Sequence, residues 1–229
     1  MRRYLMTTVV NIRDLGGYPI GPNAFTQYGR LIRSDAPINL SEDESQLLKS
    51  KKIDTVIDLR TQEEVVKAPS FFYQKEGFHY YHQGMNHDGR KIKSEEEMPL
   101  SYMELIEDRK NIQGIMKIIA DSPNGVLFHC TAGKDRTGVV AALLLSLAGV
   151  PASDVIADYQ ISYTYLYCIL PLLFYEYPDS PVYLGQSKPE YIAKFFKLFS
   201  EKYHTPSEYL LDIGLSNSQI SRIRNKLIL

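Results

Sequence analysis

The amino-acid sequence predicts an α/β fold in which a mostly parallel central sheet is flanked by helices. Short β-branched or apolar runs alternate with longer segments of helical periodicity, which is the pattern of strand–helix–strand units. The runs 53–59 (IDTVIDL) and 126–128 (VLF) are typical of buried strands. No internal repeat or long linker interrupts the 229 residues, so we expect a single domain over residues 1–229.

The first half of the chain opens with turn-rich sequence. Residues 1–37 are rich in glycine and proline, which predicts short strands and turns. Ser41 and Glu44 have the spacing of a capping box, so a helix should follow and run to about Lys51. A further strand is expected at 78–82, and the charged, glycine-containing segment 83–98 is expected to form a surface loop.

The second half is predicted to be largely helical. Helical periodicity covers 100–120, and residues 139–147 are apolar all round, which indicates a helix buried in the core. Further helices are expected at 153–174, 189–203, 206–213 and 217–227.

Charge and composition exclude several classes of function. Lys and Arg number 26 against 27 Asp and Glu, so no overall field favours nucleic acid, and none is expected as a partner. The longest apolar run is too short for a membrane span, so stable membrane insertion is not expected. Cys130 and Cys168 are too few for a disulfide framework and favour a reducing compartment. We expect a cytoplasmic protein, with a secreted form that has lost its leader as the alternative.

The segment 129–137 (HCTAGKDRT) has the pattern of an anion-binding loop. It places Cys130 at the end of a strand and Arg136 at the start of the buried helix. The five residues between them can curl into a ring whose N–H groups point inward and bind a tetrahedral anion beside the helix N-terminus. Ala132 and Gly133 are small enough to admit phosphate oxygens, and the planar guanidinium of Arg136 can hold two of them.

The helix N-terminus and the charge of Arg136 also favour a thiolate at Cys130. This thiolate can displace a phosphoryl group and form a phosphocysteine that water later hydrolyses. Thr137 is expected to hydrogen-bond the sulfur, and His129 to order the loop backbone. We expect no metal and no cofactor. The expected phosphate-binding residues are Thr131, Ala132, Gly133, Lys134, Asp135, Arg136 and Thr137.

The loop matches the protein tyrosine phosphatase signature, and the chain resembles the bacterial tyrosine phosphatase family of atypical dual- and triple-specificity enzymes. The resemblance extends over nearly the whole chain, through residues 11–18, 29–34, 57–60 with Glu63 or Glu64, 158–162 and 209–227. It implies a protein tyrosine phosphatase-like fold. It also implies hydrolysis of phosphotyrosine, with phosphoserine, phosphothreonine or phosphoinositides as further substrates.

A general acid must protonate the leaving oxygen. The sequence has no tryptophan, so the Trp-Pro-Asp loop of conventional tyrosine phosphatases is absent. Asp135 is the first candidate, and the resembling enzymes imply the same position. Asp58, at the end of a predicted parallel strand, is the second, with the orientation of the loop backbone or of Arg60 as its alternative role. Asp88 is the third, with a simple turn residue as the alternative.

Lys134 adds a positive charge that a single aryl phosphate does not require. A Gly-Lys-x-Arg arrangement resembles lipid phosphatases and implies phosphoinositide or multiply phosphorylated substrates. A solvated lysine, or one paired with Asp135, is the alternative. Two other functions stay open, a narrow phosphoinositide or inositol-phosphate phosphatase and an inactive phosphate-binding module. The expected partners are a phosphorylated protein or phosphoinositide, with inorganic phosphate as product and loop ligand.

Three further features have two readings each. The arginines of the first 33 residues could line a basic approach to the site or form structural ion pairs. The aromatic stretch 163–177 could be a core helix, or a lid or membrane-contacting face. Cys168 is expected to be buried and inert, with a redox partner for Cys130 as the alternative. The arginines concerned are Arg2, Arg3, Arg13, Arg30 and Arg33.

Overall fold

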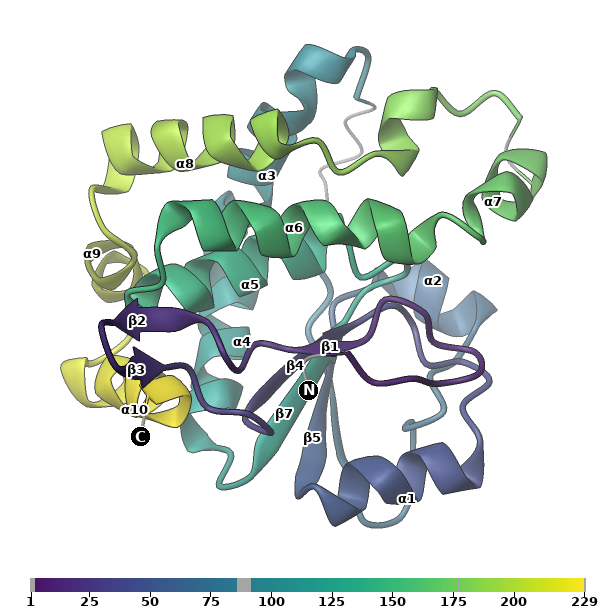
Figure 1. Cartoon of the computed structure of the whole chain (residues 1–229), viewed down its shortest axis with the longest axis horizontal. Helices are drawn as coiled ribbons and strands as arrows, with labels where there is room; N and C mark the ends of the chain where they lie inside the picture. Colours follow the sequence, from purple (N-terminus) through teal and green to yellow (C-terminus); the bar gives the residue numbers. More distant parts are fainter. Residues whose placement is uncertain (1–2, 86–91, 177, 229) are drawn as a thin grey trace.

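A five-stranded sheet in the order β1-β4-β7-β5-β6 forms the centre of the computed structural model, which describes residues 3–85, 92–176 and 178–228 (Figure 1). The inner strands pair in parallel, and β1 joins one edge antiparallel. The predicted α/β class with a mostly parallel sheet is therefore confirmed. The strands are β1 (Arg13–Asp14), β4 (Leu31–Ser34), β7 (Gly125–His129), β5 (Ile53–Asp58) and β6 (His79–His82), and a separate hairpin pairs β2 (Pro19–Gly21) with β3 (Ala24–Phe25).

Side chains along the inner strands alternate between two cores, because successive residues of a strand point to opposite faces. Leu31, Val126 and Phe128 belong to the larger core. Ile32 and Leu127 belong to the smaller one, which the first helix covers. The sheet is therefore buried on both faces, as expected for parallel strands.

Helices supply the two outer layers (Figure 1). The smaller core lies against α1 (Glu42–Ser50), and the larger one lies under the remaining long helices, with the apolar α5 at its centre. Because α5 contacts α3, α6, α9, α10 and two strands, nearly all of its faces are buried. The other helices are α2 (Gln62–Lys67), α3 (Met98–Glu107), α4 (Arg109–Asp121), α5 (Asp135–Ala148), α6 (Ala152–Leu166), α7 (Leu170–Glu176), α8 (Pro189–Tyr203), α9 (Pro206–Asp212) and α10 (Asn217–Ile228).

Two of the predicted helices are each divided in the structure. The segment 100–120 breaks at Asp108, whose carboxylate accepts hydrogen bonds from the backbone and side-chain nitrogens of Asn111 and so caps α4. The segment 153–174 breaks between α6 and α7, before Pro171, which lacks the N–H that a continuous helix needs. Two short 3-10 turns, Glu95–Glu97 and Val182–Gly185, and the helix α2 were not predicted.

The register of the sheet determines where the candidate site lies. Ser34, Asp58 and His82 are aligned with His129 in one row across the four parallel strands. This row is the carboxyl end of the sheet, where ligand sites of open α/β folds gather. The loop after His129 therefore starts between the ends of β4 and β5. None of the helices in the described ranges is both long and apolar enough to cross a membrane.

Candidate active site

The predicted loop lies between β7 and α5, as the sequence indicated. Cys130 directly follows β7 and is 3% exposed. Arg136 is in the first turn of α5, with a side chain that is 15% exposed. Burial lowers the pKa of this guanidinium, but the hydrogen bonds to Glu64 and the negative charge of that carboxylate outweigh it and raise the pKa. Arg136 therefore stays charged beside the sulfur.

The loop backbone is fixed from outside by hydrogen bonds to four consecutive carbonyls. A trans peptide points its N–H opposite to the preceding C=O, so the amides of residues 132–135 face the interior of the loop. In the described part of the chain, the amides of residues 132–134 have no protein acceptor. Such a nest is suited to an anion. The bonds are Ala36 N to Thr131 O (3.1 Å), Asn11 Nδ2 to Ala132 O (2.9 Å), and Arg33 Nη2 to Gly133 O (2.7 Å) and Lys134 O (3.2 Å).

Gly133 is required by both its backbone angle and its neighbours. Its φ is +65°, in the left-handed region. A Cβ at this position would lie 2.5 Å from the carbonyl oxygen of Ser34 and from the amide of Asp35. The loop can therefore pack against the end of β4 only with glycine here.

A buried ion cluster supports the loop from behind. Asp158 of α6 pairs with Arg13 at 2.9 Å and with Arg33, and the hydroxyl of Tyr18 donates to it at 2.8 Å. Burial raises the pKa of Asp158, but the two guanidinium charges outweigh it and hold the pKa far below its usual range. Arg13 and Arg33 are at most 2% exposed, so they are structural and do not line an approach to the site. Their partner is Asp158, and not Asp14 or Asp35, the acids that lie beside them in the sequence.

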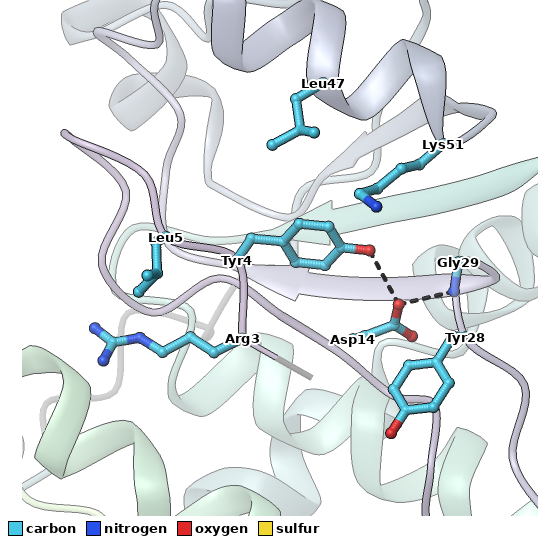
Figure 2. Close-up of a pocket in the computed structure, with 8 residues that line it drawn as sticks. All are labelled: Arg3, Tyr4, Leu5, Asp14, Tyr28, Gly29, Leu47 and Lys51. Atoms are coloured by element: carbon cyan, nitrogen blue, oxygen red, sulfur yellow. Dashed lines mark hydrogen bonds between the residues drawn. The ribbon is translucent and has the colours of Figure 1, made fainter. Parts of the chain in front are cut away.

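Asp14 has a structural role in another part of the molecule. Figure 2 shows its carboxylate accepting hydrogen bonds from the Tyr4 hydroxyl (3.0 Å) and the Gly29 amide (2.7 Å). The pocket beside it is lined by the N-terminal segment, the entry to β4 and side chains of α1 such as Leu47 (Figure 2). Asp14 thus ties β1 to the start of β4.

Glu64 is a site residue whose role the sequence left undefined. Its carboxylate accepts hydrogen bonds from Nη1 and Nη2 of Arg136, at 2.6 and 2.8 Å, and from the hydroxyl of Thr131. It also forms a capping box with Thr61, which starts α2 and fixes the carboxylate in place. Burial raises the pKa of Glu64, but the hydrogen bonds and charge of Arg136 lower it to about 2. The Thr-x-x-Glu spacing of Thr61 and Glu64 was the sequence pattern that could have predicted this helix start and the position of its carboxylate.

Asp135 and Lys134 lie together at the start of α5. Oδ1 of Asp135 accepts a hydrogen bond from the Tyr102 hydroxyl (2.5 Å) and lies 3.2 Å from Nζ of Lys134. The ammonium also donates to the carbonyls of Leu184 (2.8 Å) and Gln186 (2.6 Å), and Lys134 is only 2% exposed. These contacts favour the interpretation that Lys134 is paired with Asp135 over the interpretation that it is a free charge beside a bound phosphate.

Asp58 lies at the level of the loop but is enclosed. It is 0% exposed and accepts hydrogen bonds from Arg60 (Nη2 to Oδ2, 2.7 Å) and from the Tyr80 hydroxyl (2.9 Å). Burial raises its pKa, but the charge of His129, when protonated, and that of Arg60 outweigh it and lower the pKa. These contacts favour the role of orienting Arg60. Asp88 lies outside the described residues.

Two smaller predictions differ from the structure. The Thr137 hydroxyl is buried without a hydrogen-bond partner in the described ranges, so the expected bond to the sulfur is absent here. Cys168 is exposed rather than buried, because it lies where α6 ends.

His129 is buried, which lowers its pKa to about 4, and its Nδ1 lies 3.4 Å from the Cys130 carbonyl, consistent with a backbone-ordering role. Within 163–176, the part of the aromatic stretch that the structure describes, the chain is only partly core, since Tyr167 and Tyr175 are exposed.

Comparison with known proteins identifies the family. Residues 4–229 match the family model described as the tyrosine phosphatase family. The chain belongs to this family. Membership confirms the resemblance carried by the loop and its flanking motifs, and with it the phosphatase-like α/β fold. Among the described residues, no group of three or more His, Cys, Asp or Glu side chains is arranged to hold a metal ion.

Individual relatives of this family member match over part of their length. A tyrosine-protein phosphatase of Nostoc commune is 33% identical over 137 residues, 56% of this chain and 46% of the relative. The triple specificity protein phosphatase PtpB of Mycobacterium tuberculosis is 31% identical over 121 residues, 45% of this chain and 44% of the relative. The chain spans about half the length of the curated relatives it matches.

A solved structure gives a weaker likeness over more of the chain. It is the core catalytic domain of the PP-IP phosphatase of S. cerevisiae in complex with citrate, which is 16% identical. The match covers 87% of this chain and 96% of that domain, with a TM-score of 0.44.

Proposed function

We propose that this protein is a metal-independent phosphoester hydrolase that uses Cys130 as its nucleophile on phosphotyrosine. Phosphoserine, phosphothreonine and phosphoinositides are the further substrates in the proposal. The observation that supports it is the loop backbone. Four consecutive carbonyls are hydrogen-bonded outward, which leaves the intervening amides around Cys130 without a protein acceptor in the described ranges. Family membership supports the same activity.

In the proposed reaction, the loop amides and the guanidinium of Arg136 hold the phosphate dianion. The Cys130 thiolate attacks phosphorus, the bond from phosphorus to the ester oxygen breaks, and Asp135 gives its proton to the leaving oxygen. Asp135, now a carboxylate, takes a proton from the incoming water. That water breaks the sulfur–phosphorus bond and releases inorganic phosphate and the thiolate.

The contacts of Lys134 favour an ordinary phosphomonoester over a narrow preference for phosphoinositides. Its buried ammonium is committed to Asp135 and to two carbonyls, so it is not free for a second phosphate group. We therefore expect phosphotyrosine peptides to outperform phosphoinositides as substrates. Assays of both substrate classes with wild type and Lys134→Ala test this preference, and a selective loss of phosphoinositide turnover in the variant would contradict it.

Cys130→Ser is the direct test of the mechanism. It should abolish turnover of a phosphotyrosine peptide, because a hydroxyl is far less ionised than a thiol, while orthovanadate still binds the intact amides. Cys168→Ser is the matched control, since that thiol is exposed, and it should keep wild-type activity. Substantial hydrolysis by Cys130→Ser, or loss of wild-type activity in a chelator, would reject the proposal.

A further inference from the structure

Two buried tyrosines connect the carboxylate of Asp135 to the helices around it. The hydroxyl of Tyr102, on α3, lies 2.5 Å from Oδ1 of Asp135 and 2.5 Å from the hydroxyl of Tyr159, on α6. Tyr102 is 0% and Tyr159 1% exposed, and their rings pack edge to face. Because α3 and α6 both pack against α5, the start of which carries Asp135, three helices fix the position of one carboxylate (Figure 1).

The two hydroxyls donate in one direction. Burial, reinforced by the charge of Asp135, raises the pKa of Tyr102 and of Tyr159 well above 10, so both keep their protons at neutral pH. An ionised carboxylate can only accept hydrogen bonds, so the single proton of Tyr102 points to Asp135. Tyr159 must then donate to the oxygen of Tyr102. The pair forms a short chain of donors that ends on Asp135.

Both close donors meet the same carboxylate oxygen. Oδ1 accepts from Tyr102, and the ammonium of Lys134 lies 3.2 Å from that oxygen. Oδ2 has no hydrogen-bond partner in the part of the chain that is described, and the side chain of Asp135 is 31% exposed. An oxygen that faces a hydroxyl proton and an ammonium is a poor place for a third proton. When Asp135 is protonated, the proton therefore belongs on Oδ2.

We propose that Tyr102, oriented by Tyr159, is a positioning residue that keeps the transferable proton of Asp135 on Oδ2. This inference rests on the proposed function, in which Asp135 is the general acid. It assigns a role to two residues that lie outside the loop. The role differs from structural support, because it matters only where proton donation limits the reaction.

The leaving-group dependence of kcat/KM distinguishes the two roles. Phenyl phosphate releases a phenol about as basic as tyrosine, whereas dinitrophenyl phosphate releases a much more acidic phenol that leaves without help. Tyr102→Phe should lower kcat/KM about tenfold for phenyl phosphate and less than about twofold for dinitrophenyl phosphate, because only the first needs an aligned acid. Tyr159→Phe should show the same selectivity with a smaller loss, because Tyr102 keeps its bond to Asp135.

A double mutant tests whether the tyrosine acts through Asp135. Asp135→Asn alone should show the same selectivity with a larger loss, and adding Tyr102→Phe should lower kcat/KM no further. Tyr209→Phe is the matched control. Its buried hydroxyl donates to the Ile106 carbonyl on α3 at 2.6 Å and does not reach Asp135, so both substrates should keep wild-type rates.

The outcomes separate the inference from the proposed function. Equal losses on both substrates in Tyr102→Phe and Tyr159→Phe, or additive losses in the double mutant, overturn the positioning role while Asp135 keeps its own. An Asp135→Asn variant without leaving-group selectivity overturns the acid assignment, and the positioning role with it. Orthovanadate affinity and thermal denaturation of each variant show whether the loop and fold are intact.

Discussion

Glu64 accepts hydrogen bonds from both terminal nitrogens of Arg136, at 2.6 and 2.8 Å. Glu64 lies in α2, and its carboxylate also caps the start of that helix. One carboxylate thereby links the start of α2 to the first turn of α5. The planar pair fixes the orientation of the guanidinium before any anion arrives. Pre-orientation lowers the entropy that a bound phosphate must overcome, so Glu64 should matter for affinity as well as for rate.

Glu64→Gln should weaken orthovanadate binding and lower kcat/KM about tenfold, because an amide keeps the capping oxygen but loses the charged two-point contact with Arg136. Titration with orthovanadate and steady-state kinetics measure the two effects. Glu63→Gln is the matched control, since its side chain is exposed and adjacent in sequence. Equal orthovanadate affinity and equal kcat/KM in the two variants would show that Glu64 does not contribute to the site.

The same variant has a signature in the pH dependence of stability. A carboxylate whose pKa falls to about 2 on folding from its ordinary 4.5 stabilises the folded state fully above pH 4.5. That contribution is lost as the pH falls toward 2. Urea denaturation between pH 5 and about 2.5 should therefore show a steeper decline for wild type than for Glu64→Gln. The contribution itself is modest, because the pair is partly exposed.

Gly133→Ala should abolish phosphate binding, because a Cβ would meet the backbone of Ser34 and Asp35 at 2.5 Å and force the loop away from β4. Gly149→Ala is a matched control, since φ is +89° there but the Cβ would meet nothing within 4 Å. The control should lose about 1 kcal/mol of unfolding free energy from backbone strain alone and keep wild-type kcat/KM. Orthovanadate titration and urea denaturation compare the two, and retained binding in Gly133→Ala would show that the loop tolerates displacement.

Asp158→Asn should lower the free energy of unfolding by about 3–5 kcal/mol, because it leaves two buried guanidinium groups without their carboxylate. Arg33 also donates to the Gly133 carbonyl, so the surviving folded fraction should bind orthovanadate more weakly. Urea denaturation measures the first effect. Asp154→Asn, on the same helix, should cost less than about 1 kcal/mol, since only the charge at the helix N-terminus is lost. A loss of similar size in both variants would contradict the role of the cluster.

The sequence predicted most of what is determined locally. The loop residues 129–137 are contiguous in the sequence. The apolar segments 126–128 and 139–147 on either side predict the strand and the helix that flank the loop. The helix 189–203 was predicted with its observed bounds, because its apolar positions repeat with helical period. The short helix α2 was missed, since six residues carry too little periodicity, although its capping box was present.

Contacts between distant residues could not be predicted. Arg136 and Glu64 are 72 positions apart, and Arg13 and Asp158 are 145 apart. The motifs that carry the family resemblance include Glu64 and Asp158, but a motif does not indicate which distant side chain each carboxylate contacts. No local pattern states that a helix end, a strand and a loop converge, because tertiary packing decides which charges are buried together.

Asp58→Asn should separate the second candidate acid from the first. Asp58 is enclosed, ionised and bonded to Arg60 and Tyr80, so it has no route to a leaving oxygen in this arrangement. The variant should lose about 3–5 kcal/mol of unfolding free energy, because Arg60 stays buried without its charge partner. Its kcat/KM should fall by the same factor for phenyl and dinitrophenyl phosphate, in contrast to the selective loss expected of Asp135→Asn. A selective loss in Asp58→Asn would mean that the carboxylate leaves Arg60 during catalysis and would transfer the acid role from Asp135 to Asp58.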